Sequence, residues 1–210
     1  MIGAVLTFAV LGGTFTPPAL QQAPLGPVPF GARAAGLVVL DVGVDERGGV
    51  ADVNVVKDVQ PFGEGLARDV RGWRFEPASE DGRAVPFRVL VAALVRPAAL
   101  LFPDPGAPPP PPAGASEGIP YPESVVVPPY PPNALGDAAA IVEVEVTGEG
   151  AAASVRLVGQ PGAFDSPALE AAQGWRFRPA RHAGTGVAAR GYLVFVFRAP
   201  VTTPAPSVPR

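Results

Sequence analysis

One sequence segment occurs twice in this chain of 210 residues, and its two copies lie 102 residues apart. The copies read Trp-Arg-Phe-Glu-Pro-Ala at 73–78 and Trp-Arg-Phe-Arg-Pro-Ala at 175–180. A shift of the chain by 102 positions aligns roughly 60 residues without a gap, as expected for a duplicated structural unit. Matched positions include Val42 with Val144, Phe62 with Phe164, Arg88 with Arg190, and Arg96 with Arg198. We therefore expect two copies of one small domain.

Each copy predicts the order strand, strand, helix, strand. Alternating apolar residues at 38–45 and 50–57, separated by a glycine-containing turn, predict a hairpin. Apolar residues at helical spacing predict a helix over 63–72, and a third strand follows at 85–96. The second copy repeats this pattern at 141–146, 153–158, 168–174 and 187–198, with Asp165 or Ser166 as helix N-cap. The expected fold class is α+β, with two small domains that are each a three-stranded antiparallel sheet packed on one helix.

Proline is concentrated between the expected domains, and a run of five prolines occupies 108–112. Such runs favour an extended polyproline II conformation. We expect a first domain at 24–100, a proline-rich linker at 101–129, a second domain at 130–200 and a disordered tail at 201–210. The linker is either a passive spacer or a ligand for a proline-binding domain.

Residues 2–15 form an uncharged apolar run that Pro17 and Pro18 terminate. A membrane-spanning helix needs roughly 20 apolar residues, so this run is better suited to the hydrophobic region of a secretory signal. We expect residues 1–23 to be either a signal peptide cleaved near Ala23 or a membrane anchor. A buried strand or helix is the remaining alternative.

The composition argues against several classes of function. The formal net charge of -3 argues against a nucleic-acid-binding protein, and the absence of cysteine excludes thiolate chemistry and disulfides. The single histidine, His182, falls in a polar loop where a surface role is expected. Glu143 and Glu145 share one face of a strand, but this face should be solvated, and the first copy does not reproduce the pair. We expect no enzymatic activity, no metal and no cofactor.

The repeated pattern resembles the C-terminal domain of TonB-family energy transducers. The resemblance rests on the strand-turn-strand sequence at 142–158, the helix and Trp-Arg-Phe-x-Pro-Ala at 166–180, and the last strand at 191–198. Tyr130-Pro131 at the start of the second copy is similar to the Tyr-Pro pair at the start of that domain. The first copy has Pro29-Phe30 at the corresponding place. The resemblance implies a periplasmic location and binding of a short peptide from an outer-membrane TonB-dependent receptor. It also implies a membrane anchor coupled to an ExbB–ExbD-type motor.

The chain departs from that plan because its N-terminal segment has no histidine, whereas family anchors carry a Ser/His pair for motor coupling. Two hypotheses follow for this envelope protein. The first is a transducer that stays anchored in the inner membrane through its N-terminal segment. The second is a soluble periplasmic adaptor or scaffold with no motor.

We expect the third strand of each copy to bind a partner, because a three-stranded sheet leaves that strand with one free edge. The strand at 187–198 is apolar on both faces, so the face away from the helix needs a cover, which is the other domain, a second chain as in a homodimer, or a ligand. The predicted partner-binding residues are Tyr130, Pro131, Arg190, Tyr192, Val194, Val196 and Arg198, with Phe87, Val89 and Val91 in the first copy. The predicted core residues are Trp73, Phe75, Pro77, Trp175, Phe177 and Pro179.

Overall fold

The fold is taken from a computed structural model of the chain. It describes residues 8–10, 13–27, 35–96, 118–159, 162–182 and 184–199. The proline run at 108–112, Phe30 and the tail at 201–210 lie outside the described residues.

Two equivalent units, residues 19–95 and 121–197, build most of the structure. The first unit contains β3 (Ala19–Gln22), β4 (Gly36–Val44), β5 (Val50–Lys57), α1 (Phe62–Val70), β6 (Arg74–Glu76), β7 (Ala78–Glu80), β8 (Arg83–Val85) and β9 (Phe87–Val95). The second contains β10 (Tyr121–Ser124), β11 (Ala138–Val146), β12 (Ala152–Val158), α2 (Asp165–Gly174), β13 (Arg176–Arg178), β14 (Ala180–His182), β15 (Thr185–Val187) and β16 (Ala189–Phe197). Every strand of the first unit begins 102 residues before its counterpart, which is the spacing found in the sequence.

The two units share one six-stranded sheet with the strand order β12-β11-β16-β9-β4-β5. Neighbouring strands within each unit are antiparallel, whereas β9 and β16 pair in parallel at the centre. The molecule is mostly sheet with two helices, so the α+β class agrees with the prediction. The three-stranded sheets are not separate, because the third strands β9 and β16 pair edge to edge.

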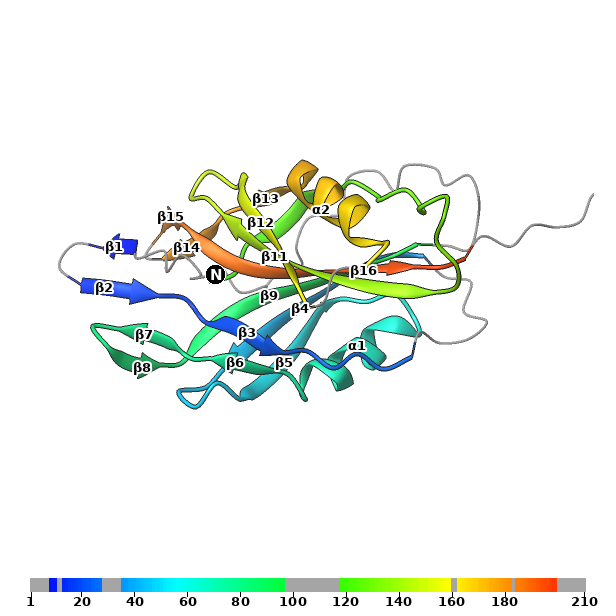
Figure 1. Ribbon diagram of the computed structural model, residues 1–210. Coiled ribbons are helices and arrows are strands. Elements are labelled where there is room, and N and C mark those ends of the chain that lie inside the picture. The colour runs from blue at the N-terminus through cyan, green and yellow to red at the C-terminus, as the bar shows by residue number, and fades with distance from the viewer. Residues whose placement is uncertain are drawn as a thin grey trace, which may run out of the picture.

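The helices cover opposite faces of the shared sheet, with α1 on one side and α2 on the other (Figure 1). Each helix packs over its own unit and over the central strand of the other. Leu90, Ala92 and Leu94 of β9 belong to the core beneath α2, and Tyr192 and Val194 of β16 belong to the core beneath α1. Burial of both faces explains why these two strands carry almost no polar residues.

A short strand precedes the main strands of each unit. In the second unit, β10 pairs with β13, so residues 121–124, which lie in the predicted linker, form a strand. In the first unit, β3 pairs with β6, which places residues 19–22 within the folded body and before the predicted domain start at residue 24. Short strands of this kind depend on pairing with distant residues, and their local sequence gives little periodic signal.

An N-terminal hairpin, β1 (Phe8–Val10) and β2 (Gly13–Thr16), joins β7 and β8 in a four-stranded sheet. Part of the predicted signal or anchor therefore forms strands. No helix among the described ranges is long and apolar enough to cross a membrane.

The predicted helices are close to those in the structure. The first spans Phe62–Val70, and the second begins at Asp165 with Phe164 at the N-cap position and no side-chain capping hydrogen bond. Asp165 instead accepts a hydrogen bond from the backbone N–H of Gly162. The third strand of each copy is divided in two, by Pro86 in the first unit and by Ala188 in the second. Pro86 has no N–H to donate to a ladder, which accounts for the break in the first unit.

Candidate functional site

The third strands meet in a parallel seam, where Leu90 to Val95 lie opposite Gly191 to Val196. The other side of β16 pairs with β11, and the other side of β9 pairs with β4. The expectation of a free edge on the third strand is therefore wrong for this fold. The neighbouring unit supplies the strand that occupies it.

The seam has a defined hydrogen-bonding direction. The backbone N–H of Arg96 donates to the carbonyl of Val196 over 3.2 Å, so the peptide groups of Val196 point toward β9. Because peptide groups alternate along a strand, those of Tyr192 and Val194 also point toward β9. The peptide groups of Leu193 and Phe195 point toward β11.

Six of the predicted partner-binding residues lie together on the α1 face of the sheet. Four of them are buried and two are partly buried against the same core: Val89, Val91, Tyr192 and Val194, then Phe87 and Val196. Phe87 packs against Phe15, and Tyr192 packs against Trp73 and Phe75. In this arrangement they form the packing between the units.

Tyr192 has a role that the sequence analysis did not identify. Its ring is fully buried, and its hydroxyl accepts a hydrogen bond from the N–H of Leu20 at 3.0 Å and donates to the carbonyl of Pro18 at 3.2 Å. Burial raises the pKa of this phenol far above its usual value. Tyr192 therefore ties the N-terminal strand of the first unit to the second unit. The Pro17-Pro18 pair before β3 was the available signal, but it was interpreted only as a terminator.

Arg190 lies in an ion-pair network at the same end of the sheet. Its Nη2 is 3.1 Å from Glu145 Oε1, its Nε is 3.6 Å from Glu143 Oε1, and its Nη1 donates to the carbonyl of Pro18. Glu143 also accepts from Arg156 at 3.0 Å. The paired carboxylates are thus held by arginines, which is a structural arrangement.

The first unit has an equivalent network around Arg88. The Nε of Arg88 lies 2.6 Å from Asp41 Oδ1, and its Nη2 lies 2.8 Å from Asp52 Oδ1. Burial, together with the nearby Asp52, raises the pKa of Asp41 despite the lowering by Arg88. The carboxylate is well paired but costly to bury.

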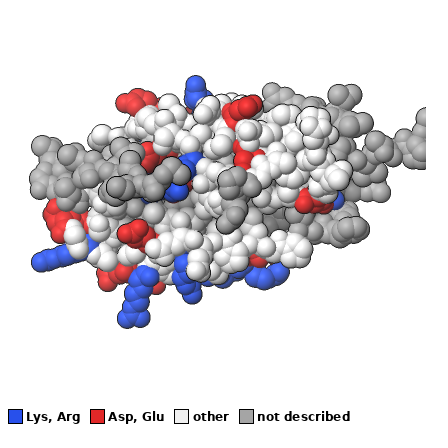
Figure 2. Space-filling view, viewed as in Figure 1, with Lys and Arg blue, Asp and Glu red and all other residues white. Residues whose placement is uncertain are grey.

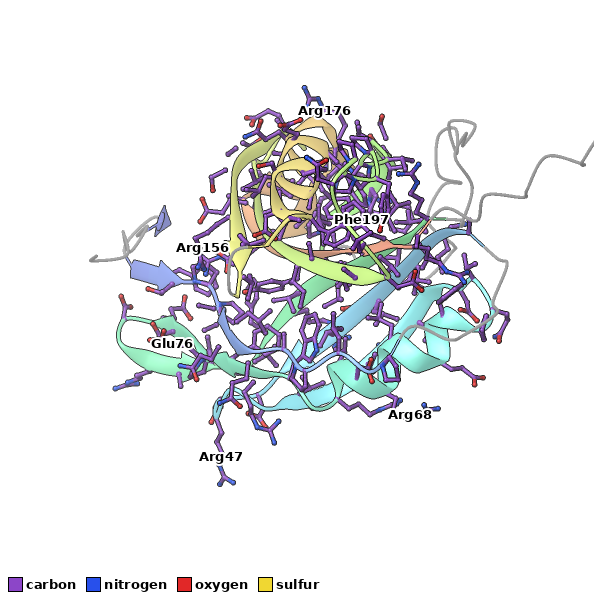
Figure 3. The ribbon with its side chains drawn as sticks, turned by 45° about the vertical axis from the view of Figure 1, so that its right-hand side comes forward. Arg47, Arg68, Glu76, Arg156, Arg176 and Phe197 are labelled. Carbon is purple, nitrogen blue, oxygen red and sulfur yellow. The ribbon has the colours of Figure 1, made fainter. Side chains whose placement is uncertain are left out.

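Tyr130 and Pro131 lie on the α2 side of the molecule, apart from the six residues beneath α1. The Tyr130 ring packs edge-on against Phe164 with ring centroids 5.6 Å apart. Phe164 in turn packs on Phe197, which is labelled in Figure 3. The Tyr130 hydroxyl donates to the carbonyl of Gly136 at 2.7 Å. Arg198 lies nearby, with its Nε 4.0 Å from Asp137.

The repeated Trp-Arg-Phe segment lies in equivalent positions in both units. Trp73 and Trp175 are fully buried, and their Nε1 groups donate to the carbonyls of Pro24 and Val126, in each case over 3.1 Å. Phe75 and Phe177 are buried beside them, and Pro77 and Pro179 are half-buried.

The terminal strands β5 and β12 each pair on one side only among the described residues, with β4 and β11 respectively. They are the outer edges of the shared sheet. Ala51 and Ala153 are exposed at equivalent positions on these strands, and Val55 is 46% exposed. An unpaired strand edge can accept another extended segment.

No group of three or more metal-ligating side chains occurs within the part of the chain that the structure describes. His182 is the last residue of β14 and pairs with Thr185 of β15.

Residues 127–199 match the family model described as Gram-negative bacterial TonB protein C-terminal. The match begins just before Tyr130 and ends two residues after β16, so it covers the second unit without β10. The second unit is similar to the TonB C-terminal domain, and this supports a relationship to the TonB family of transport energy transducers. No curated protein and no solved structure matches the chain.

Members of that family are transport proteins of the cell envelope and are not known as enzymes, and in general they interact with outer-membrane receptors and the ExbB–ExbD complex. The match to TonB C-terminal domains does not extend to the first unit, whose equivalence to the second rests on the structure.

Proposed function

We propose that this chain is a TonB-like envelope protein that binds an extended segment of a partner by β-strand addition. The observation that carries the proposal is the TonB C-terminal match over 127–199, in a sheet whose terminal strands have no pairing partner on their outer sides among the described residues. A peptide of an outer-membrane TonB-dependent receptor is the partner that this family relationship suggests.

The outer strands β5 and β12 are the proposed binding edges, because the third strands already pair with each other. Addition at the third strand, where Tyr192 and Val194 lie, would require the two units to separate. Lys and Arg side chains project mainly from the lower side of the molecule in the view of Figure 2. On the outer strands themselves, β5 carries Asp52 and Lys57, and β12 carries Arg156.

Site-specific photo-crosslinking in a Gram-negative host tests this proposal. A photo-reactive phenylalanine replaces Ala51 or Ala153, which are exposed and equivalent on the two outer strands. The matched controls are Arg68 and Glu170, which are exposed and equivalent on the two helices. We expect adducts with an outer-membrane receptor from one or both strand positions and none from the helix positions. Equal adducts from all four positions, or none from any strand position, would reject strand addition at the outer edges.

A soluble periplasmic adaptor without a motor is the second candidate. It is favoured by the packing of the N-terminal segment, in which β2 pairs with β7, β3 pairs with β6, and Leu20 is only 8% exposed. Residues committed to these contacts would have to leave the folded body if the whole segment entered a membrane. Membrane contact through the N-terminal segment and coupling to an ExbB–ExbD-type motor belong to the transducer alternative.

Fractionation and intact mass distinguish the two candidates. Full-length protein in the inner-membrane fraction would favour the transducer, and protein in the soluble periplasm would favour the adaptor. The N-terminal residue of the soluble form is informative, because cleavage near Ala23 would remove β3 and its hydrogen bond to Tyr192.

A further inference from the structure

Arg96, immediately after β9, is a buried cation with few partners. The residue is 8% exposed, and its Nη1 donates to the carbonyl of Pro128 at 3.3 Å. Its Nε, like that of Arg190, is buried without a hydrogen-bond partner among the described residues. No carboxylate among the described residues lies within ion-pair distance of its guanidinium. Burial lowers its pKa, as expected for a charge removed from water.

The equivalent residue of the second unit has a carboxylate nearby, whereas Arg96 has none among the described residues. Arg198 lies 102 positions later, and its Nε is 4.0 Å from Asp137 Oδ2. The position equivalent to Asp137 in the first unit is Ala35, which has no charge. The same arginine is thus retained in both units, while the carboxylate occurs in only one. A buried charge without a partner destabilises a fold, so its retention points to a ligand.

Arg96 lines an open hollow of about 500 Å³ on the surface of the second unit. The walls are mainly proline and apolar side chains, with one aromatic ring: Pro129, Tyr130, Pro131, Pro132, Ala134 and Leu135. Leu135 is 94% exposed, which is unusual for a large apolar side chain in a folded protein. The hollow therefore combines one cation with an apolar surface that is open to solvent.

We propose that this hollow binds an acidic side chain of a partner's extended peptide segment. A carboxylate can accept from the Arg96 guanidinium where it lines the hollow, and the neighbouring residues of the peptide can pack on the prolines and Leu135. A single cation suits a singly charged carboxylate better than a phosphate group, which usually meets several donors. The proposal does not depend on strand addition, because the hollow lies away from β5 and β12.

The first test compares two peptides on the unmodified full-length chain, so that no variant has to fold. The probes are acetyl-Ala-Val-Asp-Val-Ala-amide and the same peptide with Asn in place of Asp. The readouts are the affinity from calorimetry and the Nε–Hε signal of Arg96 in a nitrogen-15 NMR spectrum. We expect the acidic peptide to bind at least about tenfold more tightly and to shift that signal.

A second test uses Arg96→Met, with Arg47→Met as its control, because Arg47 is exposed and projects into solvent away from the hollow (Figure 3). We expect Arg96→Met to lose the preference for the acidic peptide while the melting temperature stays level or rises. Arg47→Met should keep the preference.

Equal affinity for the two peptides, or binding that leaves the Arg96 signal unmoved, would overturn the proposal. The double variant Asp104→Asn, Glu117→Gln removes two carboxylates of the chain itself. If the Arg96 signal shifts in this variant without peptide, one of these carboxylates is the partner of Arg96, and the proposal is overturned. A large loss of stability in Arg96→Met would identify Arg96 as a structural residue.

Discussion

The two units of this chain share their internal framework and differ in their surface chemistry. In both, a buried tryptophan donates to a carbonyl 49 residues earlier, and the phenylalanine two residues later donates its N–H to a turn glycine at 2.8 Å. The differences lie at the ends of the central strands and at the entry segments. Tyr192 in β16 corresponds to Leu90 in β9. Arg198 has an acidic neighbour, whereas Arg96 has none in the part of the chain that the structure describes.

This comparison separates the framework that both units share from the surroundings in which they differ. Arg96 is an example of both, because the arginine is retained in Arg198 while its surroundings differ. Positions that are identical in both units are mostly core or turn positions, where burial and close packing allow few alternatives. Positions that differ are free to form contacts between the units or with a partner. The predictions below test whether the shared framework is equally important in both units.

The largest expected effect is loss of the buried tryptophan. Trp73→Ala and Trp175→Ala should each lower the free energy of unfolding by about 3–5 kcal/mol, because each leaves a large cavity and an unpaired carbonyl. The losses should be similar, since the two side chains have the same burial and the same hydrogen bond. Urea denaturation should show a single transition for both units, because they share one sheet. Two separate transitions would indicate that the units fold independently.

The turn glycines should have the next largest effect. Gly150 has a φ of +85°, and a Cβ atom there would lie 1.8 Å from the carbonyl oxygen of Phe177. Gly150→Ala should therefore cost about 2–4 kcal/mol, measured by thermal denaturation. Gly184→Ala is a matched control, because its φ is +80° but nothing lies within 4 Å of the added Cβ. The control should cost only about 1 kcal/mol, and equal losses would mean that backbone conformation alone sets the cost.

The hydrogen bonds of Tyr192 should have a moderate effect that is specific to one unit. Tyr192→Phe leaves the N–H of Leu20 without its partner in a buried position, so a loss of about 1–3 kcal/mol is expected. The N-terminal strand should also become more sensitive to proteolysis. Tyr130→Phe removes an exposed hydrogen bond and should cost less than about 1 kcal/mol. Equal losses of stability in Tyr192→Phe and Tyr130→Phe would show that Tyr192 does not hold β3 in place.

The smallest expected effect is on the pH dependence of stability. Folding raises the pKa of Asp41, so the folded state binds the proton more tightly than the unfolded chain. This contribution to stability is present below the unfolded pKa of about 3.9 and is lost as the pH rises through the folded pKa. The stability of the unmodified protein should therefore decline as the pH rises above the unfolded pKa of Asp41, and Asp41→Asn should remove this decline. Urea denaturation between about pH 3.5 and 6 measures both profiles. An unchanged pH profile would show that Arg88 fully offsets the burial of Asp41.

Local patterns in the sequence predicted the main strands and helices, and long-range pairing accounts for most of what they missed. Alternating valines at 38–44 and the repeated Trp-Arg-Phe segment indicated the strands and the buried side chains. The segment at 19–22 gave no comparable signal, because its pairing with β6 involves residues more than 50 positions away. The apolar faces of 187–198 indicated a covered strand but could not identify the cover.

The candidate site was predictable only in part for the same reason. Val194 and Val91 could both be predicted as partner-binding residues, because they lie in equivalent strands of the two units. The register that brings β9 beside β16 connects residues about 100 positions apart, and no local rule encodes it. The buried position of Arg96 also depends on contacts with the other unit, so its missing counter-ion became visible only in the structure.

Amide hydrogen exchange across the seam is the most direct test of the central claim that the third strands of the two units, β9 and β16, pair with each other. The amide of Val194 points toward β9, and the amide of Phe195 points toward β11. We predict that both amides exchange slowly, together with those of Tyr192 and Val196, and that Val194→Pro accelerates exchange in β9. Fast exchange at Tyr192, Val194 and Val196 beside slow exchange at Leu193 and Phe195 would contradict the account. The third strand would then have a free edge in solution.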